Sequence, residues 1–340
     1  MNIAINGFGR IGRIVARQLF ANPELRKNLN LVAINDLATP GELAHSFKYD
    51  STHGTYRLDV KSDAESITID GHKFQCLKLS KPEELPWAKL GIDLVLDCTG
   101  RFTDKDSASV HLKQGAKKVI ISAPAKGVDL TCVMGVNHTQ YDNAKHHIVS
   151  NASCTTNCLA PIVHVLHNAF EVKHGFMTTI HSYTSDQRLI DNIHKDPRRA
   201  RSAATNMIPT TTGAAKTVGE VIPALKGKLD GFSVRVPTPN VSLTDFVCTT
   251  KKKTTKEEVN KILQEAAQGP LKGILDFCSL PLVSSDYNGN KFSSIVDAEQ
   301  TNVHVADDGE CMIKVCSWYD NETGFSCRML EFANLIAAKL

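Results

Sequence analysis

The chain has 340 residues, of which 42% are hydrophobic and 22% charged, and its formal net charge is +3. This length suits two domains with a sizeable core, and the small net charge gives no reason to expect a nucleic-acid or membrane partner. The sequence lacks a signal-peptide pattern and any apolar stretch of about 18 residues, and its ten irregularly spaced cysteines indicate free thiols in a reducing compartment, so a cytoplasmic location is expected.

Over the first 150 residues, short β-branched runs alternate with helical patterns. Strands are expected at 2–6, 29–36, 66–70, 93–100, 117–123 and 132–136, and helices at 10–21, 40–48 and 104–114. Because apolar strands that alternate with helices form parallel sheets, this part predicts an α/β nucleotide domain of the Rossmann type with a doubly wound sheet.

From residue 154 onward the strands become longer. Strands are expected at 175–184, 232–239, 241–250 and 311–320, and helices at 154–169, 212–224, 255–267 and 324–340. This pattern predicts an α+β catalytic domain with a large mixed sheet. The polar connection 185–206 is long for a compact domain, so it is expected to be functional or interfacial.

A glycine-rich turn, "INGFGRIGR", follows the first expected strand and opens the first expected helix. Gly7 allows a tight turn, Gly9 lets backbone amides approach a pyrophosphate, and Gly12 permits close packing of helix on strand. Asp36, at the end of the next strand, would accept hydrogen bonds from ribose hydroxyls and repel a 2′-phosphate, which favours NAD over NADP. Strand-end residues expected near the same ligand, unless they are ordinary turn residues, are Thr99, Gly100 and Ser122.

Cys154 stands at the start of the expected helix 154–169, in "SNASCTTNCLAP". Asn151 and Ser153 are suitable capping residues, so the thiol is expected in the first helical turn. There the helix dipole and a neighbouring imidazolium would lower the thiol pKa and favour the thiolate. The alternative is a packed cysteine in an ordinary capped helix. Cys158, about one turn later, is expected to be a buried neighbour or an oxidation partner, and no Cys/His group has the spacing of zinc ligands.

A thiolate beside a nicotinamide has a definite chemical use. It can attack an aldehyde to form a hemithioacetal, and loss of a hydride to NAD+ then leaves a thioester. A base must remove the hemithioacetal proton. Among thirteen histidines, His181 is the preferred base because it ends an apolar strand, "TTIHSYT", and has polar neighbours.

Two segments predict binding of phosphate groups. Residues 210–213, "TTTG", stand at an expected helix start, where hydroxyls, amides and the helix dipole can bind an anion, although capping alone also explains them. Arg235 lies in an otherwise apolar strand, where an unpaired charge is costly, so a bound anion or a carboxylate is expected beside it.

Ten segments in chain order resemble phosphorylating glyceraldehyde-3-phosphate dehydrogenases of the bacterial type, over essentially the whole chain. They are "INGFGRIGR", "VAIND", "FKYDSTHG", "KKVIISAPAKG", "SNASCTTNCLAP", "TTIHSYT", "HKDPRRARSAA", "IPTTTGAAK", "RVPTPNVS" and "WYDNETGFSCRM". The resemblance implies a glycolytic enzyme that oxidises D-glyceraldehyde 3-phosphate with NAD+ and inorganic phosphate to 1,3-bisphosphoglycerate. It also implies a homotetramer, in which the connection 185–206 reaches a neighbouring subunit's cofactor.

The resemblance further implies a division into domains and roles for single residues. The C-terminal helix would return to the nucleotide domain, giving domains of 1–152 with 317–340 and of 153–316. Cys154 is implied as the nucleophile and His181 as the base. Cofactor-binding positions are Arg10, Ile11, Asp36, Ser122 and Asn321, the last holding the nicotinamide carboxamide. Ligands of the substrate phosphate are Thr184 and Arg235, and those of the attacking phosphate are Ser153, Thr155, Thr212 and Gly213, with Arg199 close to both.

Three positions depart from the family pattern. Thr323 replaces a tryptophan beside Asn321, Ser185 replaces a common Asn or Ala, and Asn192-Ile193 replaces the Leu-Pro that NAD-specific members commonly carry. The last departure leaves acceptance of NADP open, although the charge of Asp36 favours NAD. Erythrose-4-phosphate dehydrogenase is the nearest alternative function. A thiol hydrolase or acyltransferase and a non-catalytic NAD-binding protein are more distant ones.

Overall fold

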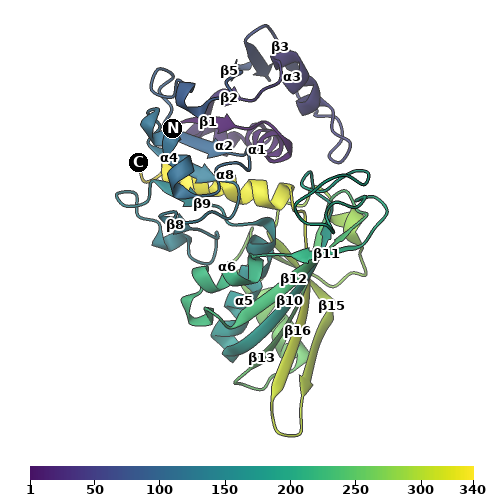
Figure 1. The fold of residues 1–340 in the computed structure, drawn as a ribbon. Helices are drawn as coiled ribbons and strands as arrows, with labels where there is room; N and C mark the ends of the chain where they lie inside the picture. Colours follow the sequence, from purple (N-terminus) through teal and green to yellow (C-terminus); the bar gives the residue numbers. More distant parts are fainter. The chain divides into compact units, whose positions relative to one another are not determined.

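The computed structural model describes residues 1–340, which form two compact units (Figure 1). Unit 1 consists of Met1–Cys132, His138–Ser153 and Ser326–Leu340, and unit 2 of Val133–Asn137 and Cys154–Phe325. The C-terminal segment of unit 1 begins at Ser326, within the last helix, α8 (Thr323–Ala337). None of the helices combines the length and apolar character needed to cross a bilayer.

Unit 1 is built on a nine-stranded sheet in the order β3-β4-β5-β2-β1-β6-β7-β9-β8. Its strands are β1 (Asn2–Asn6), β2 (Asn30–Asn35), β3 (Val60–Ser62), β4 (Ser66–Ile69), β5 (His72–Leu77), β6 (Leu94–Asp97), β7 (Lys118–Ile121), β8 (Leu130–Thr131) and β9 (Ile148–Ser150). Its helices, apart from short 3-10 turns, are α1 (Arg10–Phe20), α2 (Pro23–Asn28), α3 (Pro40–Lys48) and α4 (Lys105–Lys113). The strands from β5 to β8 in this order run parallel, which confirms the predicted doubly wound sheet.

The segment 132–136 is not the strand that its apolar residues predicted. Gly135 takes a positive φ of 82°, which side-chain-bearing residues seldom adopt, and the segment turns there. The Asn137 side chain accepts a hydrogen bond from the amide of Val133 at 2.8 Å. This local bond replaces the ladder bonds of a strand, so the pairing with β9 ends with β8 at Thr131.

Unit 2 is built on a seven-stranded sheet in the order β11-β12-β10-β13-β16-β15-β14. Its strands are β10 (Val172–Ser182), β11 (Ile208–Thr211), β12 (Leu229–Val236), β13 (Ser242–Thr250), β14 (Leu275–Cys278), β15 (Ser294–Val305) and β16 (Cys311–Tyr319). Its helices are α5 (Cys154–Phe170), α6 (Ala214–Val221) and α7 (Lys256–Gln268). Parallel and antiparallel pairs both occur, which confirms the predicted mixed sheet.

Helices α5 and α6 cover the same side of this sheet (Figure 1). Strand β13 alternates buried and partly exposed positions along its whole length, and the helix α5 packs on it and on β15 and β16. The strand register then places functional side chains together. His181 on β10 pairs with Arg235 on β12 in parallel, and Arg235 pairs in turn with Ile208 on β11. Paired residues point to the same face, so His181 and Arg235 stand side by side.

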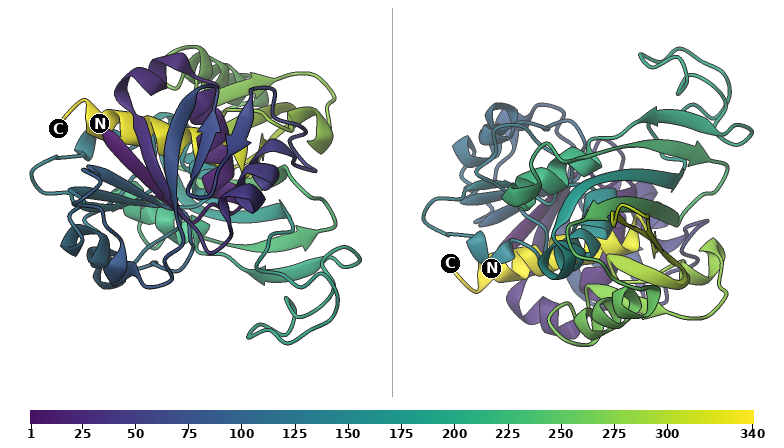
Figure 2. Two further views of the ribbon diagram at one scale, coloured as in Figure 1. Left: turned by 90° about the horizontal axis from the view of Figure 1, so that it is seen from above. Right: turned by 90° about the horizontal axis from the view of Figure 1, so that it is seen from below.

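The 210–213 segment differs from the expected helix start. Thr210 and Thr211 end the strand β11, which sequence reasoning missed, and α6 begins only after Gly213 at its N-cap. Two β-branched residues favour the strand over the helix here. The helix ends before Pro223, whose ring disfavours helical backbone at the preceding residue, so it is shorter than the predicted 212–224. The connection 185–206 is extended coil and turns, and both views of Figure 2 show it leaving the sheet.

Candidate active site

The glycine turn of unit 1 forms the wall of a cavity of about 300 Å³. Gly7 has a φ of +89°, and a Cβ there would lie 2.8 Å from the backbone of Cys98, so only glycine fits. A Cβ on Gly12 would lie 2.1 Å from the carbonyl oxygen of Gly7. Because Gly12 has no side chain, α1 can pack closely on the turn. Gly9 differs, because a Cβ there would meet no atom within 4 Å. The space around Gly9 is therefore open, which leaves room for a ligand to approach the backbone there.

Asp36 lines the same cavity at the end of β2, where the sequence predicted it. One carboxylate oxygen accepts from the amide of Phe8 at 2.7 Å and the other from the amide of Leu37 at 2.7 Å. The carboxylate therefore joins the glycine turn to the next strand. Thr99 also lines this cavity, and Arg10 at the start of α1 is paired with Asp50.

The remaining predicted cofactor neighbours of unit 1 lie at helix and strand ends. Ile11 is half-buried in the first turn of α1, and Gly100 is exposed in the turn after β6 with a φ of 68°. Ser122 directly follows β7, and its amide donates to the carbonyl of Asp97 at 2.9 Å. These positions are at the carboxyl ends of parallel strands or at a helix N-terminus, as the fingerprint requires.

In unit 2, Cys154 is the first residue of α5. The backbone two residues earlier is strained, because Ala152 has a φ of 57°. The Sγ atom of Cys154 lies 3.5 Å from Nε2 of His181. The other ring nitrogen, Nδ1, lies 2.7 Å from the carbonyl oxygen of Ser182, which can only accept. Nη1 of Arg235, which can only donate, also lies 3.2 Å from Nδ1, but the contact with the carbonyl is shorter. We therefore assign the ring proton to Nδ1, so that the lone pair of Nε2 faces the thiol.

The protonation of this pair differs from the sequence-based expectation. Burial raises the pKa of the Cys154 thiol above its ordinary value, against smaller lowering effects of Arg235 and of hydrogen bonds from Thr155. Burial and then the charge of Arg235 lower the pKa of His181 to about 3. The thiol pKa is thus raised where the sequence predicted a lowering, because loss of water outweighs the effects of the helix terminus and of Arg235.

Sequence reasoning missed Tyr319, whose side chain contacts the elements that carry Cys154 and His181. Tyr319 is buried, and its hydroxyl lies 2.9 Å from the hydroxyls of both Thr155 and Thr179. Its ring stands edge-on to the ring of His181, with centroids 6.0 Å apart. These hydrogen bonds of Tyr319 link α5, β10 and β16. No local pattern in the sequence predicts them.

Arg235 lies beside His181 without a carboxylate partner. Its Nη1 donates to the carbonyl of Ser182 and to the hydroxyl of Thr184, each at 3.1 Å. Its Nε is buried and has no hydrogen-bond partner. Of the two partners that the sequence predicted, an anion or a carboxylate, no carboxylate is bound to Arg235, and an anion beside its partly buried side chain stays a prediction.

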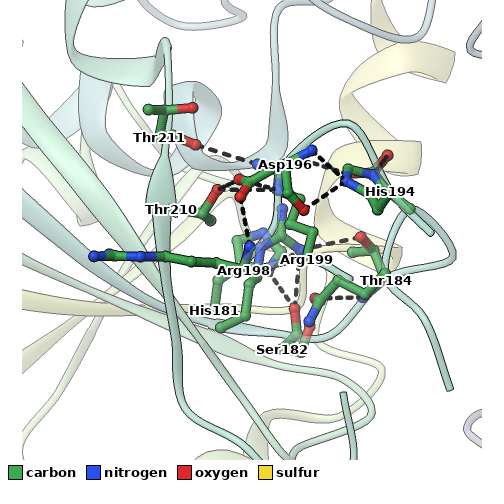
Figure 3. A network of polar contacts seen from close by, with 12 residues as sticks. His181, Ser182, Thr184, His194, Asp196, Arg198, Arg199, Thr210 and Thr211 are labelled. Carbon is green, nitrogen blue, oxygen red and sulfur yellow. Dashed lines mark hydrogen bonds and ion pairs between the residues drawn. The ribbon is translucent and has the colours of Figure 1, made fainter. Parts of the chain in front are cut away.

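Arg199, by contrast, is held by two carboxylates of the 185–206 connection (Figure 3). Its Nη1 binds Asp186, and its Nε lies 3.7 Å from a carboxylate oxygen of Asp196. The same Nε donates at 2.9 Å to the hydroxyl of Thr210, which donates in turn to Asp196 at 2.9 Å. These bonds hold the 185–206 connection against β11. The positive charge of Arg199 also contributes to the lowered pKa of His181.

The positions predicted for the attacking phosphate are only partly open. Gly213 is exposed at the N-terminus of α6, and the Thr212 hydroxyl accepts from the amide of Ala214 at 3.2 Å. Ser153 immediately precedes Cys154 and is partly exposed. The Thr155 side chain points inward to Tyr319, so a contact of Thr155 with phosphate would have to use its backbone amide.

Asn321 is oriented by two hydroxyls that sequence reasoning did not identify. Ser182 and Ser242 both donate to its Oδ1, each at 2.9 Å. The amide oxygen is thereby used, and the NH₂ group is the side of Asn321 that can donate to a ligand. Thr323, which replaces the family's tryptophan, is buried at the start of α8, and its amide is bound by Asp320 at 2.8 Å.

Cys158 lies one turn further along α5 in different surroundings. It is fully buried, and its Sγ lies 3.3 Å from the hydroxyl of Thr244 and 3.5 Å from that of Ser294. Burial raises its pKa to about 11. Of the two roles expected for Cys158, these contacts fit that of a buried neighbour. All ten cysteines are free thiols.

Comparison with known proteins gives a consistent result over both units. Residues 1–105 match the family described as glyceraldehyde 3-phosphate dehydrogenase, NAD binding domain, and residues 153–321 match its C-terminal domain. The chain is 53% identical to glyceraldehyde-3-phosphate dehydrogenase of Geobacillus stearothermophilus, and the match covers 100% of this chain and 99% of the relative. It is 54% identical to glyceraldehyde-3-phosphate dehydrogenase 2 of Trichormus variabilis and 52% to glyceraldehyde-3-phosphate dehydrogenase 1 of Bacillus subtilis, with the same coverage.

Proposed function

The chain belongs to the glyceraldehyde 3-phosphate dehydrogenase family, and from this premise we propose how its own residues perform the reaction. The substrate is D-glyceraldehyde 3-phosphate, which is oxidised with NAD+ and inorganic phosphate to 1,3-bisphosphoglycerate in glycolysis. The observation that carries the proposal is the 3.5 Å contact between the Cys154 thiol and Nε2 of His181. It gives a nucleophile a base whose lone pair faces it.

The cavity of unit 1 fits NAD+. The open surroundings of Gly9 at the N-terminus of α1 suit a pyrophosphate, and the carboxylate of Asp36 suits ribose hydroxyls and opposes a 2′-phosphate. We assign Gly7, Gly12, Arg10, Ile11, Thr99, Gly100 and Ser122 to the same ligand, and the NH₂ group of Asn321 to its carboxamide. When bound, NAD+ supplies the acceptor for a hydride.

The first covalent step uses both members of the pair. As Sγ of Cys154 bonds to the aldehyde carbon, its proton moves to Nε2 of His181, which returns it to the carbonyl oxygen to give a hemithioacetal. His181 then takes the hydroxyl proton as hydride leaves the same carbon, and a thioester to Cys154 results. The charge that appears on His181 is stabilised by the Ser182 carbonyl, which accepts the Nδ1 proton.

Inorganic phosphate then attacks the thioester, so that a carbon–oxygen bond forms and the carbon–sulfur bond breaks, and the released sulfur of Cys154 takes back the proton held on Nε2 of His181. We assign Arg235 and Thr184 to the phosphate group of the aldehyde substrate, since the partly buried Arg235 has no carboxylate partner and its buried Nε is unpaired. We assign Ser153, the backbone of Thr155, Thr212 and Gly213 to inorganic phosphate. Arg199 adds positive charge near the site, although two carboxylates hold it.

We further propose a homotetramer in the cytoplasm. The connection 185–206 and the residue after it carry large apolar side chains that are exposed in the single chain, among them Ile193 at 88%, Leu189 at 78% and Met207 at 75%. Such exposure on a coil is typical of a protein–protein contact. Ten free thiols suit the reducing conditions of the cytoplasm.

An assay of cofactor reduction tests the proposal. The protein, NAD+, D-glyceraldehyde 3-phosphate and phosphate should give steady formation of the reduced cofactor, and omission of phosphate should stop it after the thioester forms. Erythrose 4-phosphate should be the poorer substrate by kcat/KM. Preference for erythrose 4-phosphate, or turnover that ignores phosphate, would contradict the assignment.

A further inference from the structure

A buried carboxylate, Asp97, lies at the end of β6 beside the nucleotide cavity. It is 1% exposed, and no lysine or arginine pairs with it. Four donors reach it instead. The hydroxyl and amide of Thr99 donate to Oδ1 at 2.8 and 3.2 Å, while the Asn6 amide group and Nε2 of His111 reach Oδ2 at 2.8 and 3.2 Å. The negative charge is stabilised by neutral groups alone.

The direction of the hydrogen bond from His111 is set by Trp87. The indole Nε1 of Trp87 lies 3.1 Å from Nδ1 of His111, and an indole nitrogen can only donate. Nδ1 of His111 must therefore accept, which leaves the ring proton on Nε2, facing Asp97. Both aromatic residues are fully buried, so no water competes for these bonds.

Asp97 in turn orients the side chains that line the cavity. The Asn6 amide donates to Asp97, so its oxygen is free to accept from the amide of Asn35 at 2.9 Å. Thr99 uses its hydroxyl proton on Asp97, and its oxygen accepts from the amide of Arg101 at 3.0 Å, so one lone pair of this oxygen remains as an acceptor. All three side chains line the cavity together with Asp36. The cavity wall thus offers acceptors at Thr99 and Asp36, which suit the hydroxyl donors of a ribose.

We propose that Trp87, His111 and Asp97 form a relay that positions the adenosine-binding wall without touching the ligand. The relay rests on the proposed use of NAD+. Trp87 selects the tautomer of His111, His111 completes the shell of donors around Asp97, and Asp97 holds Asn6 and Thr99. These are positioning residues, so their loss should weaken cofactor binding and leave the chemistry at Cys154 unchanged.

Three substitutions of His111 separate the relay from simple packing. Gln places an N–H donor where Nε2 stood, Asn places an acceptor where Nδ1 stood, and Leu provides neither. His111→Gln should bind NAD+ and ADP-ribose within about twofold of the wild type, whereas His111→Asn and His111→Leu should bind both about tenfold more weakly. The kcat at saturating NAD+ and the KM for the aldehyde should not change.

The control is His72→Leu, which removes an imidazole ring from β5 of the same unit. His72 bonds only to the carbonyl of Leu31, at 2.8 Å, outside the relay, and its loss should leave NAD+ affinity unchanged. Affinity retained by His111→Asn but lost by His111→Gln would overturn the relay. So would equal affinity in all three variants, or a parallel change in kcat and in the KM for the aldehyde.

A double-mutant cycle tests the role of Trp87 without a large cavity. Trp87→Phe should weaken NAD+ binding about threefold in the wild type, because His111 can then place its proton on either nitrogen. In the His111→Gln background it should have no further effect, because the Gln donor needs no tautomer. Trp318→Phe, which removes a donor to Asp297 at 3.1 Å in unit 2, serves as the control. Additive losses in the cycle would exclude tautomer selection.

The same titrations distinguish the relay from the proposed function. A wild-type protein that fails to bind NAD+ contradicts the function. A wild-type protein that binds NAD+, with affinity unmoved by His111→Leu and Trp87→Phe, contradicts the relay alone.

Discussion

The nucleotide cavity of unit 1 and the thiol site of unit 2 are built in different ways. The cavity is shaped by backbone, through the close packing of Gly7 and Gly12 and the open surroundings of Gly9. The thiol site is assembled from side chains of separate elements, with Cys154 on α5 and His181 on β10. The difference shows where each is sensitive: the glycine turn is sensitive to added side-chain volume, whereas the thiol site is sensitive to the direction of single hydrogen bonds.

The largest effect is expected from removal of the nucleophile. Cys154→Ser should lower the dehydrogenase rate by at least about 10⁴-fold, because a hydroxyl in a neutral site is a far weaker nucleophile than a thiol. NAD+ affinity, measured by titration, should not change. Cys158→Ser on the same helix is the control and should retain activity within a few-fold. A Cys154→Ser enzyme with more than a hundredth of the activity would contradict the assignment.

The base should matter less than the nucleophile, but still strongly. His181→Asn should slow acylation by about 10²- to 10⁴-fold, the usual contribution of a positioned base. Alkylation of Cys154 by iodoacetamide at neutral pH should slow as well, because no group then accepts the thiol proton. An alkylation rate equal to that of the wild type would show that His181 does not activate Cys154.

The same histidine predicts a loss of stability in acid. The fold lowers the pKa of His181 from 6.5 to about 3, so between these values the unfolded chain binds a proton that the folded chain excludes. This stabilisation is fully present above pH 6.5 and is lost as the pH falls through that window. From pH 7 to pH 5, urea unfolding should show a loss of about 2 kcal/mol more in the wild type than in His181→Asn. If the free energy of unfolding changed with pH by the same amount in both proteins, the imidazole of His181 would be accessible to solvent, contrary to the structure.

The smallest effects should distinguish the glycines of unit 1. Gly9→Ala should fold normally, since its Cβ meets no atom within 4 Å, but should bind NAD+ about tenfold more weakly because the methyl group obstructs the ligand. Gly12→Ala should instead lower the thermal unfolding temperature, since its Cβ would lie 2.1 Å from a carbonyl oxygen. Titration and thermal unfolding of both variants test this. If Gly9→Ala bound NAD+ as tightly as the wild type, the pyrophosphate would not bind at this turn.

Much of unit 1 could be predicted because its function depends on residues close in sequence. The turn from Gly7 to Gly12 joins consecutive elements, and its spacing reports its geometry directly. The strands β3, β5, β8 and β9 of unit 1 and the strands β11, β14 and β15 of unit 2 were nevertheless missed, because short or mixed segments become strands only through pairing with other strands. The apolar segment 132–136 was wrongly predicted as a strand, because a local turn prevailed over its composition.

The thiol site shows what sequence alone leaves out. The motif around Cys154 indicated the proposed nucleophile, but Tyr319 contacts Thr155 from 164 positions away. Nothing near Asn321 indicated that Ser182 and Ser242 orient it. The direction of the shift in the Cys154 pKa was predicted wrongly, because burial is a property of the folded chain and outweighs the local effect of a helix terminus.

The central claim, that one sulfur atom carries the substrate through the reaction, can be tested by trapping. The wild-type enzyme is mixed with NAD+ and D-glyceraldehyde 3-phosphate without inorganic phosphate, quenched in acid and mapped by peptide mass spectrometry. We predict one reduced cofactor per chain and a 3-phosphoglyceroyl thioester on Cys154, which disappears when phosphate is added. Reduced cofactor without an acyl group on Cys154, or an acyl group on Cys158 instead, would contradict this mechanism.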